Sequence, residues 1–576
     1  MQTPSLLPLL LLVPLITALA MLLPMPWFDD RRNAWLWALG SSVLTFALSL
    51  GVAFQFNWGE AGIQMTSDIQ WIPAWGLSFG FGIDTIALWL VLLTTFLMPI
   101  TILGSLTAVA DRAREFYFWL LVLQAAMTGV FLATDIIFFY ICFEFTLIPL
   151  YFLIGVFGSR QRLAAAKMFF LYTFTGSMLT LAGLLYVAWI NASLTLEQVS
   201  AIVDPAAAAA GVAAQDLPSA YHALGQWSFN IETLYLTARE AMSFPQQAWV
   251  LAAMLAGFAV KVPLWPVHTW LPLAHTEAPT AGSVVLAGVL LKLGTYALLR
   301  FALPMTPEAV VAFAPFIGVL AVIGILYTAL VCWVQKDIKK LIAYSSVSHL
   351  GFCVLGLFAL DTDDIGAVGA VMYMINHGLS TGALFLCVGM IYERFHTREM
   401  ALMSGLARVM PVWATFMGFF VMASVGLPGL NGFVSEFLTL AGTFLSPAGV
   451  LGVPYAFVAG AGMILAAIYL LYMMGKVVFG PTRIPAHDDH GTGHHAVRDL
   501  NVREIATLAP LAVACLVFGL LPYPILQSLE PSVANMTQAA RAEVQVMHEA
   551  ELAEAEAELT EDLTADERVT LRLETD

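Results

Sequence analysis

Charged residues are scarce in this chain. Asp, Glu, Lys and Arg make up 11% of its 576 residues and hydrophobic residues make up 60%, whereas a soluble domain carries about 25% charged residues. This scarcity excludes a soluble globular enzyme. We therefore expect an all-α polytopic membrane protein that lies in a lipid bilayer, and we expect no nucleic acid among its partners.

Cysteine is also rare. The five cysteines lie apart in apolar runs, at Cys142, Cys332, Cys353, Cys387 and Cys515. None belongs to a C-x-x-C pair, which argues against an iron–sulfur cluster, a zinc site or a disulfide framework. The chain also lacks a strand followed by G-x-G-x-x-G, the motif of dinucleotide-binding units. We expect packing roles for the cysteines, and neither a metal nor another cofactor bound to this chain.

The amino terminus lacks the basic region that precedes the apolar part of a signal peptide, so we expect Met1–Leu23 to form the first span. Crossing about 30 Å of hydrocarbon takes roughly 20 helical residues. Fourteen apolar runs are long enough, namely 5–26, 34–56, 83–109, 116–134, 135–158, 166–190, 246–269, 279–302, 308–332, 338–360, 366–392, 410–444, 453–479 and 505–525. The fourth and fifth are nearly continuous and the twelfth is too long for one plain helix, so counts of thirteen and fifteen stay open.

Basic residues gather in alternate connections between these runs. The odd-numbered connections hold sixteen of them: Arg31, Arg32, Arg112, Arg114, Arg160, Arg162, Lys336, Lys339, Lys340, Arg394, Arg398, Arg408, Lys476, Arg483, Arg498 and Arg503. The even-numbered connections hold Arg239 and Arg300. Because loops rich in Lys and Arg stay in the cytoplasm, this bias predicts cytoplasmic odd-numbered connections and places both termini on the outer side.

Three polar stretches lie between or after the spans. We expect residues 191–245 to form an insertion outside the membrane. For the histidine-rich stretch 487–495, a solvated linker is favoured over a metal site. The segment 526–576 carries much of the net charge of −16, and we expect a solvated acidic helix or a disordered tail there rather than a docking element.

Four ionisable residues stand inside apolar runs: Glu144, Lys261, Lys292 and Glu436. An ionisable group at bilayer depth costs about 3 kcal/mol even on the mildest insertion scale, so four in one chain need a reason. The usual reason is a proton or ion path. A static Glu144–Lys261 ion pair is the alternative, and it is disfavoured because apolar residues replace such a pair at little cost.

Two spans are interrupted beside these charges. Pro263 and Pro266 follow Lys261 in the seventh span, and the stretch 426–432, with three glycines and a proline, precedes Glu436 in the twelfth. Freed backbone groups survive at membrane depth only in a cavity or buried in protein. Because the two spans are five apart, they cross in opposite directions, which predicts inverted repeats of spans 4–8 and 9–13. The expected divisions are spans 1–3 in 1–115, a first repeat in 116–302, a second repeat in 303–480, a loop and span 14 in 481–525, and a tail in 526–576.

The stretch Lys261-Val-Pro-Leu-Trp-Pro-Val-His268-Thr-Trp-Leu-Pro-Leu-Ala-His275-Thr-Glu277 resembles the signature of the antiporter-like membrane subunits of respiratory complex I and their cation/proton antiporter relatives. Matching runs begin at Asp337 and at Asn376, and the resemblance extends over about 80–525. Glutamate at Glu436 is typical of the M-type subunit, equivalent to the mitochondrial fourth subunit, where the L-type and N-type subunits are expected to carry lysine. The expected absence of a long lateral helix after the last span also disfavours the L type.

The resemblance implies a role for each buried charge. Glu144 and Lys261 would form a switch, because a nearby carboxylate raises the proton affinity of a lysine and desolvation lowers it. Lys292, His349 and His377 would carry protons toward Glu436, the terminal carrier. A hydrogen-bonded core histidine is the alternative for His349 and His377.

Other polar residues are expected to be structural. His268 and His275 are taken to flank the membrane surface and to pack there. Four acids at span ends are expected to cap helices: Asp84, Asp135, Glu277 and Asp337.

The resemblance therefore implies a proton-translocating subunit of bacterial NADH:quinone oxidoreductase, a translocase subunit of the inner membrane with no redox centre of its own. NADH, FMN, iron–sulfur clusters and quinone are expected on partner subunits, and L-type and N-type chains are expected as neighbours. A subunit of a multi-subunit sodium/proton antiporter and a membrane subunit of a hydrogenase-type complex stay open as alternatives.

Overall fold

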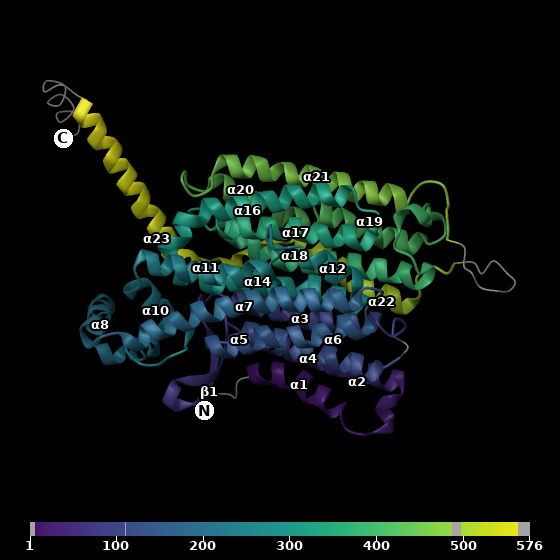
Figure 1. Ribbon diagram of the computed structural model, residues 1–576, viewed down its shortest axis with the longest axis horizontal. Helices are drawn as coiled ribbons and strands as arrows, with labels where there is room; N and C mark the ends of the chain where they lie inside the picture. The colour runs from purple at the N-terminus through teal and green to yellow at the C-terminus, as the bar shows by residue number, and fades with distance from the viewer. Residues whose placement is uncertain (1–5, 110, 486–496, 563–576) are drawn as a thin grey trace.

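The computed structural model describes residues 6–109, 111–485 and 497–562, most of which lie in long helices that run roughly parallel to one another (Figure 1). Each predicted span corresponds to a helix or a broken helix: α1 Leu7–Ala20, α2 Arg31–Gln55, α3 Thr85–Gly104, α4 Ala113–Leu132, α5 Ile136–Phe145 with α6 Leu147–Phe157, α7 Arg162–Ser193, α11 Phe244–Lys261 with α12 Trp270–Glu277, α13 Thr280–Val285 through α15 Leu303–Met305, α16 Pro307–Trp333, α17 Ile338–Leu357, α18 Ile365–Phe395, α19 Pro411–Val425 with α20 Asn431–Leu445, α21 Val453–Val477 and α22 Val502–Leu520.

Within the described residues, eleven helices are long and apolar enough to cross a membrane. The three remaining predicted spans are the short helix α1 and the two interrupted ones, α11 with α12 and α19 with α20. Both predicted breaks are therefore confirmed. Their cause is local, since proline lacks the backbone N–H that continues the hydrogen-bond ladder, and Gly426 and Gly429 adopt positive φ in the second break.

Two further spans depart from a plain helix. The fifth is divided at Thr146, between α5 and α6. The eighth contains two π-helical turns, η4 Leu286–Leu290 and η5 Leu298–Ala302, on either side of α14 Leu291–Ala297. Such turns occur often at functional sites. No proline or glycine pattern in the sequence predicts them.

One end of the bundle carries structure outside the spans (Figure 1). The insertion contains α8 Leu196–Ala210, α9 Ser219–His222 and α10 Ile231–Ala241. Strands β1 Gln64–Ile72 and β2 Leu77–Ile83 form an antiparallel hairpin, so the expectation of a purely helical chain is wrong for this segment. Apolar residues alternate along β2, a period of two that predicts a strand. Short 3-10 turns lie at Pro26–Asp29, Pro73–Trp75, Ala214–Asp216, Met400–Leu402 and Leu406–Arg408.

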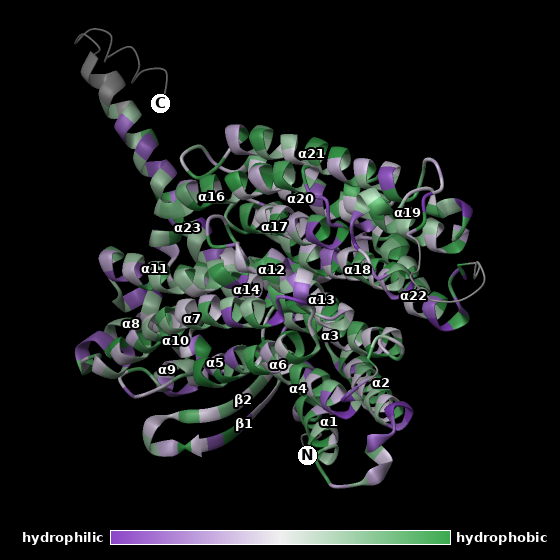
Figure 2. Cartoon of the chain, turned by 45° about the vertical axis from the view of Figure 1, so that its right-hand side comes forward, coloured by the Kyte–Doolittle hydropathy of each residue, from purple (hydrophilic) through white to green (hydrophobic). Residues whose placement is uncertain are grey.

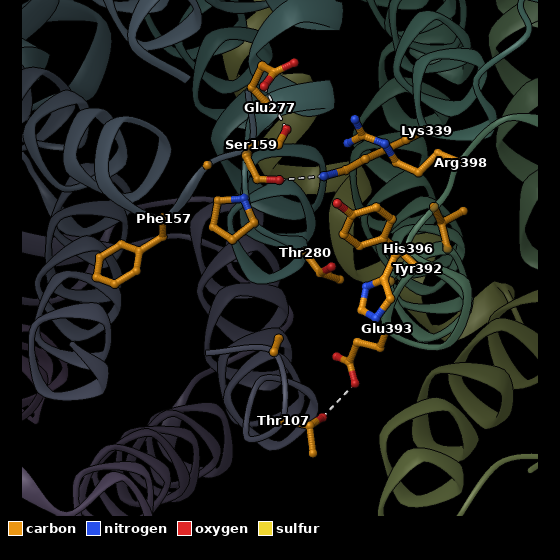
Figure 3. Close-up of a pocket in the computed structure, with 16 residues that line it drawn as sticks. Thr107, Phe157, Ser159, Glu277, Thr280, Lys339, Tyr392, Glu393, His396 and Arg398 are labelled. Atoms are coloured by element: carbon orange, nitrogen blue, oxygen red, sulfur yellow. Dashed lines mark hydrogen bonds between the residues drawn. The ribbon is translucent and has the colours of Figure 1, made fainter. Parts of the chain in front are cut away.

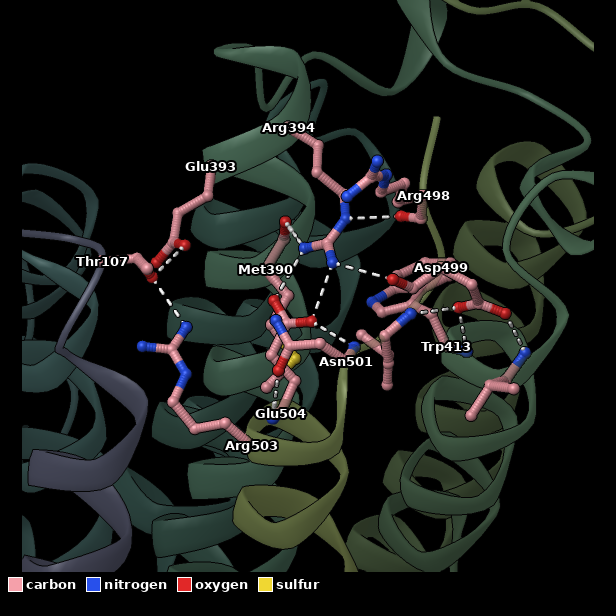
Figure 4. A network of polar contacts seen from close by, with 12 residues as sticks. Thr107, Met390, Glu393, Arg394, Trp413, Arg498, Asp499, Asn501, Arg503 and Glu504 are labelled. Carbon is pink, nitrogen blue, oxygen red and sulfur yellow. Dashed lines mark hydrogen bonds and ion pairs between the residues drawn. The ribbon is translucent and has the colours of Figure 1, made fainter. Parts of the chain in front are cut away.

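The connections rich in basic residues meet at the opposite end. The Arg394 guanidinium of α18 forms an ion pair with Glu504 of α22 at 2.8 Å (Figure 4). The Asp499 carboxylate accepts hydrogen bonds from the backbone amides of Val412 and Trp413, at the start of α19. These contacts join spans 11, 12 and 14 at the same end of the bundle. They show that the basic connections after spans 11 and 13 lie together, as the alternation of charge predicts.

The chain continues after α22 as a long helix, α23 Tyr523–Asp562. Its first part packs on the bundle through buried Leu529, Val533 and Ala540. Thr537 Oγ1 donates to Asp364 Oδ1 at 2.6 Å, and Arg541 pairs with Asp364 at 3.0 Å. The expectation that the chain lacks a long helix after the last span is therefore wrong.

The tail prediction holds for only part of α23. Residues 551–555 are exposed, and this part of the helix projects beyond the bundle (Figure 1). The prediction underestimates the packing because it rests on the acidic composition of the end of the segment, whereas the buried residues recur every three or four positions, the pattern of an amphipathic helix. Burial also raises the pKa of the Asp361 and Asp364 carboxyls in the connection beneath the helix.

The centre of the bundle is formed by span 8 and α18. The most apolar stretches of Thr280–Met305 and Ile365–Phe395 are completely buried. The helices are mostly hydrophobic along their length, while the projecting part of α23 carries hydrophilic stretches (Figure 2). Side chains on the two central helices therefore face protein on every side, and a polar group on them needs a polar partner.

Candidate functional site

Glu144 and Lys261 lie in the first half of the bundle, and the hydrogen bonds of the described residues include none between them. We call this arrangement open. Lys261 is 3% exposed, and its Nζ donates to Thr146 Oγ1 at 3.2 Å and to the Phe143 carbonyl at 3.4 Å. The ammonium also stands 4.3 Å from the centre of the Phe143 ring. Both Glu144 carboxylate oxygens lack a hydrogen-bond partner among the described residues. Lys261 thus binds to the Phe143 carbonyl and the Thr146 hydroxyl at the break between α5 and α6, and not to the Glu144 carboxylate.

The break in the seventh span positions Lys261 at the last residue of α11. The chain then turns and resumes at Trp270, the first residue of α12, whose indole Nε1 donates to the Val260 carbonyl at 2.9 Å. This bond satisfies a carbonyl that the interrupted helix leaves free. The backbone around the lysine is therefore fixed by a side chain from beyond the break.

Lys292 and His377 form a direct contact in the centre of the bundle. Lys292 is completely buried, and its Nζ lies 2.7 Å from His377 Nδ1. The same ammonium donates to the Ala287 carbonyl in the first π-helical turn. A π-helical turn shifts backbone hydrogen bonds by one residue, which leaves carbonyls available to a side chain.

His349 and Glu436 are joined by a residue that the sequence analysis did not identify. His349 Nδ1 lies 2.6 Å from the Tyr373 hydroxyl, and that hydroxyl lies 2.6 Å from Glu436 Oε1. The direct distance from His349 Nδ1 to Glu436 Oε1 is 3.5 Å. All three residues are buried. The His349 and His377 rings lie 5.6 Å apart between centroids.

The break in the twelfth span is closed by two asparagines. Asn376 Nδ2 donates to the Asn431 carbonyl at 2.8 Å, and Asn431 Nδ2 donates to the Asn376 carbonyl at 3.2 Å. These reciprocal bonds fix the start of α20 against α18. Gly426 has φ +80°, and a Cβ on it would collide with Glu436 Oε2. The broken turn therefore packs directly against the carboxylate.

A small cavity of about 10 Å³ lies between these groups, lined in part by His349, Tyr373, His377 and Glu436. Such a volume holds about one water molecule if polar partners surround it. His377 Nε2, Ser424 Oγ and Glu436 Oε2 are buried without a protein partner among the described residues. A water molecule in this cavity fits the hydrogen-bonding capacity that these atoms have left.

A larger cavity of about 480 Å³ opens at the end of the bundle where the basic connections meet (Figure 3). Its lining includes Glu277, Lys339 and Glu393. Glu277 accepts hydrogen bonds from Ser159 Oγ at 2.7 Å and from the Gln161 amide at 2.8 Å. Lys339 Nζ donates to the Ala278 carbonyl at 2.6 Å. Charged side chains therefore line a space large enough for many water molecules.

The histidines expected at the membrane surface are buried instead. His268 is 4% exposed, and His275 is not exposed and stacks on the Phe385 ring at 4.6 Å. Both His275 ring nitrogens lack a partner among the described residues. His275 lies two residues before Glu277, which lines the larger cavity. Packing explains the position of its ring but not the two unpaired nitrogens.

Three of the acids predicted as caps do cap helices. Asp84, Asp135 and Asp337 accept amide hydrogen bonds at the first turns of α3, α5 and α17. Glu277 accepts instead from the amide of Gln161, the residue before α7. Asp84 also pairs with buried Arg300 at 2.7 Å. This ion pair was not foreseen, because Arg300 was assigned to a connection.

The structure thus divides the predicted site residues into two groups. Lys292, His349, His377 and Glu436 are close together, while Glu144 and Lys261 form a separate pair. The hydrogen bonds of the described residues include none between Lys261 and Lys292. Tyr373 and Thr146 were missed because an uncharged residue in an apolar helix carries no cost that marks it in a sequence. The histidine-rich stretch 487–495 lies outside the described residues.

This arrangement suits proton exchange better than covalent chemistry. The six predicted site residues and Tyr373 form a row of two lysines, two histidines, a tyrosine and two carboxylic acids. All of these groups gain or lose a proton or pass one by hydrogen bonding. Among the described residues, no group of three or more His, Cys, Asp or Glu could hold a metal ion. The five cysteines are buried and unpaired.

Comparisons with known proteins match nearly the whole chain. Residues 133–462 match the family described as NADH:quinone oxidoreductase/Mrp antiporter, TM. Residues 12–130 match the family described as NADH-ubiquinone oxidoreductase chain 4, amino terminus. The first description covers oxidoreductase and antiporter alike, whereas the second names a single oxidoreductase chain.

Two relatives are similar over most of their length. NADH-quinone oxidoreductase subunit M of Rhodobacter capsulatus is 42% identical over 511 residues, which cover 88% of this chain and 91% of the relative. NADH-ubiquinone oxidoreductase chain 4 of Marchantia polymorpha is 38% identical over 534 residues, which cover 92% and 96%.

Solved structures share the fold. A chain of respiratory complex I from Thermus thermophilus with bound NADH matches with a TM-score of 0.75 and 28% identity, over 93% of this chain and 99% of that one. A chain of the Mrp complex from Dietzia sp. DQ12-45-1b matches with a TM-score of 0.74 and 20% identity, over 94% and 99%. The second match concerns the fold alone.

Proposed function

Since the chain belongs to the family of the chain 4, or M-type, antiporter-like subunits that translocate protons in the membrane arm of complex I, we propose that its protons travel along the buried row from Glu144 to Glu436. The observation that carries this proposal is the continuity of the second half of the row. Lys292, His377, His349 and Glu436 are linked by contacts of 2.6–2.7 Å, one ring-to-ring step and one intervening hydroxyl.

Glu144 and Lys261 act as the switch. In the open arrangement, Lys261 binds to Thr146 and a backbone carbonyl, and the Glu144 carboxylate has no hydrogen-bond partner in the part of the chain that the structure describes. Movement of the ammonium toward Glu144 would favour the charged lysine, and movement away would favour release of its proton. Such a switch needs a second position for the ammonium, and the Thr146 hydroxyl at the break between α5 and α6 provides it. An equilibrium between two positions is shifted only by a difference in binding between them.

The larger cavity is the mouth of the path on the cytoplasmic side. The basic connections that surround it support this orientation, because the positive-inside rule places them in the cytoplasm. Glu277 and Lys339 line the cavity. His275, two positions before Glu277 in the sequence, is completely buried, and its ring nitrogens have no hydrogen-bond partner among the described residues. We assign His275 to the connection between the cavity and Lys292. Both termini are then on the outer side.

Redox chemistry belongs to the partner subunits of this chain. NADH, FMN, iron–sulfur clusters and quinone bind to other subunits of the complex, and the L-type and N-type chains are the membrane neighbours. The chain lies in the bacterial inner membrane. Residues 116–302 and 303–480 form the two inverted repeats, each with one broken helix, between the first three spans (1–115) and the end of the chain (481–525 and 526–576).

Removal of Lys292 tests the proposed row. In complex I reconstituted into proteoliposomes, Lys292→Ala is expected to lower the number of protons pumped per NADH oxidised, because His377 loses its contact with the Lys292 ammonium. Lys167→Ala removes an exposed lysine of α7 and serves as the matched control. Unchanged pumping by Lys292→Ala at equal complex content would remove the central part of the row from the mechanism.

A further inference from the structure

Tyr373 has a position that packing alone does not require. It lies on α18 one turn before His377, and it is 2% exposed. Its hydroxyl contacts His349 Nδ1 and Glu436 Oε1, both at 2.6 Å. Hydrogen bonds of this length that involve a charged or chargeable group are stronger than neutral ones.

The hydroxyl fills the gap between the two titrating groups. His349 Nδ1 and Glu436 Oε1 are 3.5 Å apart, beyond the 2.7–3.2 Å range of a good N–H···O hydrogen bond. A hydroxyl donates one hydrogen bond and accepts others, so it is able to connect a nitrogen donor with a carboxylate acceptor. An ionised carboxylate only accepts. Tyr373 therefore donates to Glu436 and accepts from His349 when the acid is charged.

We propose that Tyr373 is a relay residue of this subunit, whose phenol hydroxyl passes protons between His349 and Glu436. This inference rests on the proposed role of Glu436 as the terminal carrier. In each transfer, the N–H bond of protonated His349 breaks and a new O–H bond forms on Tyr373. The original Tyr373 proton moves at the same time to Glu436 Oε1. His349 and Glu436 both end neutral, and the tyrosine has exchanged one proton for another.

The relay needs one reset for each proton. After the transfer, the hydroxyl points its hydrogen toward His349, and rotation about the C–O bond restores the first orientation. This rotation moves one hydrogen atom and leaves the ring in place. The link between His349 and Glu436 thus works without a chain of water molecules, and the cavity of about 10 Å³ beside it is too small for such a chain.

Tyr373→Phe is the direct test, because it keeps the ring against His349 and Phe352 and removes only the hydroxyl. Pumping in proteoliposomes is expected to fall about tenfold, less than the 10²–10⁴-fold typical of a lost proton-transfer group, since a water molecule could partly replace the hydroxyl. Tyr469→Phe is the matched control. Tyr469 is completely buried, and its hydroxyl has no hydrogen-bond partner among the described residues.

Two readouts separate a relay from a structural role. In Tyr373→Phe, the infrared band of protonated Glu436 is expected to shift, and the ratio of pumping rates in H₂O and D₂O is expected to change. Incorporation of 3-fluorotyrosine at position 373 keeps the hydroxyl, and it should restore pumping to near the normal level. A purely structural tyrosine would leave the isotope ratio unchanged.

The outcomes also distinguish this inference from the proposed function. Normal pumping by Tyr373→Phe together with loss of pumping by Glu436→Gln would overturn the relay and leave the route intact. Normal pumping by both variants would overturn the route itself. Equal losses in Tyr373→Phe and in the fluorotyrosine protein would assign Tyr373 to packing and overturn the relay.

Discussion

Lys261 binds Thr146 and not Glu144. Its Nζ lies 3.2 Å from Thr146 Oγ1, while both carboxylate oxygens of Glu144 have no hydrogen-bond partner among the described residues. The acid and the base of the first half are therefore present but separated. A threonine hydroxyl replaces the carboxylate as the partner of a buried ammonium, and the remaining cost of burial is reduced by the Phe143 ring at 4.3 Å.

Lys261→Ala is expected to leave the complex assembled and to lower proton pumping to about a tenth or less, with a parallel loss of quinone-linked turnover, because the switch loses its titrating group. The measurement is pumping stoichiometry in proteoliposomes at matched complex content. Lys167→Ala, at an exposed position on α7, should behave as the unmodified protein. Normal pumping by Lys261→Ala would remove this lysine from the mechanism.

The double variant Glu144→Ala/Lys261→Ala tests whether the two residues act as a unit. We expect it to pump little worse than Lys261→Ala alone, since groups that serve one step are strongly non-additive. All three variants are compared by protons pumped per NADH oxidised. Losses that add fully would place the two residues in separate steps and contradict the switch.

At Glu436 the capacity to exchange a proton should matter more than side-chain length. Glu436→Gln is expected to lower pumping about a hundredfold, near the lower end of the range for a lost acid–base group. Glu436→Asp is expected to retain part of the activity, because the shorter acid still carries a proton. Equal pumping rates in the two variants would show that the side chain serves packing or hydrogen bonding only.

Leu529 should anchor α23 to the bundle. Leu529→Ala is expected to weaken the docking of α23 by about 2–5 kcal/mol, the cost of emptying a buried leucine site. Detachment would expose Arg541, so limited trypsin cleavage there measures it. Leu552→Ala changes a leucine that is 52% exposed on the projecting part of the same helix and is the control. Equal cleavage in both variants would contradict a packed helix.

Sequence reasoning was most successful where a strong physical penalty marks the residue. A buried lysine or glutamate is costly in an apolar run, and a proline or glycine interrupts a helix visibly. Lys292, Glu436 and both broken spans were therefore predicted, and the structure confirms the burial of the first two. The alternation of basic residues predicted in the same way that the connections after spans 11 and 13 lie together, and the side of the membrane on which they lie stays a prediction.

The rest depends on contacts between distant segments. Tyr373 and Glu436 are 63 positions apart in the sequence, and their hydrogen bond follows from the packing of α18 on α20. The pairing of Asn376 with Asn431 has the same origin. The docking of α23 was missed because the acidic composition of the end of the chain predicts solvation, although apolar residues recur every three or four positions in the docked part of the helix. The hydrogen bond of Lys261 to Thr146 lies beyond any sequence pattern.

Gly426 limits how this subunit can evolve. Its backbone turn lies so close to Glu436 Oε2 that a single added methyl group would displace the carboxylate. A change at either position is therefore expected to disturb the other, although only one of them carries charge. A longer lysine side chain in place of Glu436 is expected to need a compensating change in the turn at Gly426.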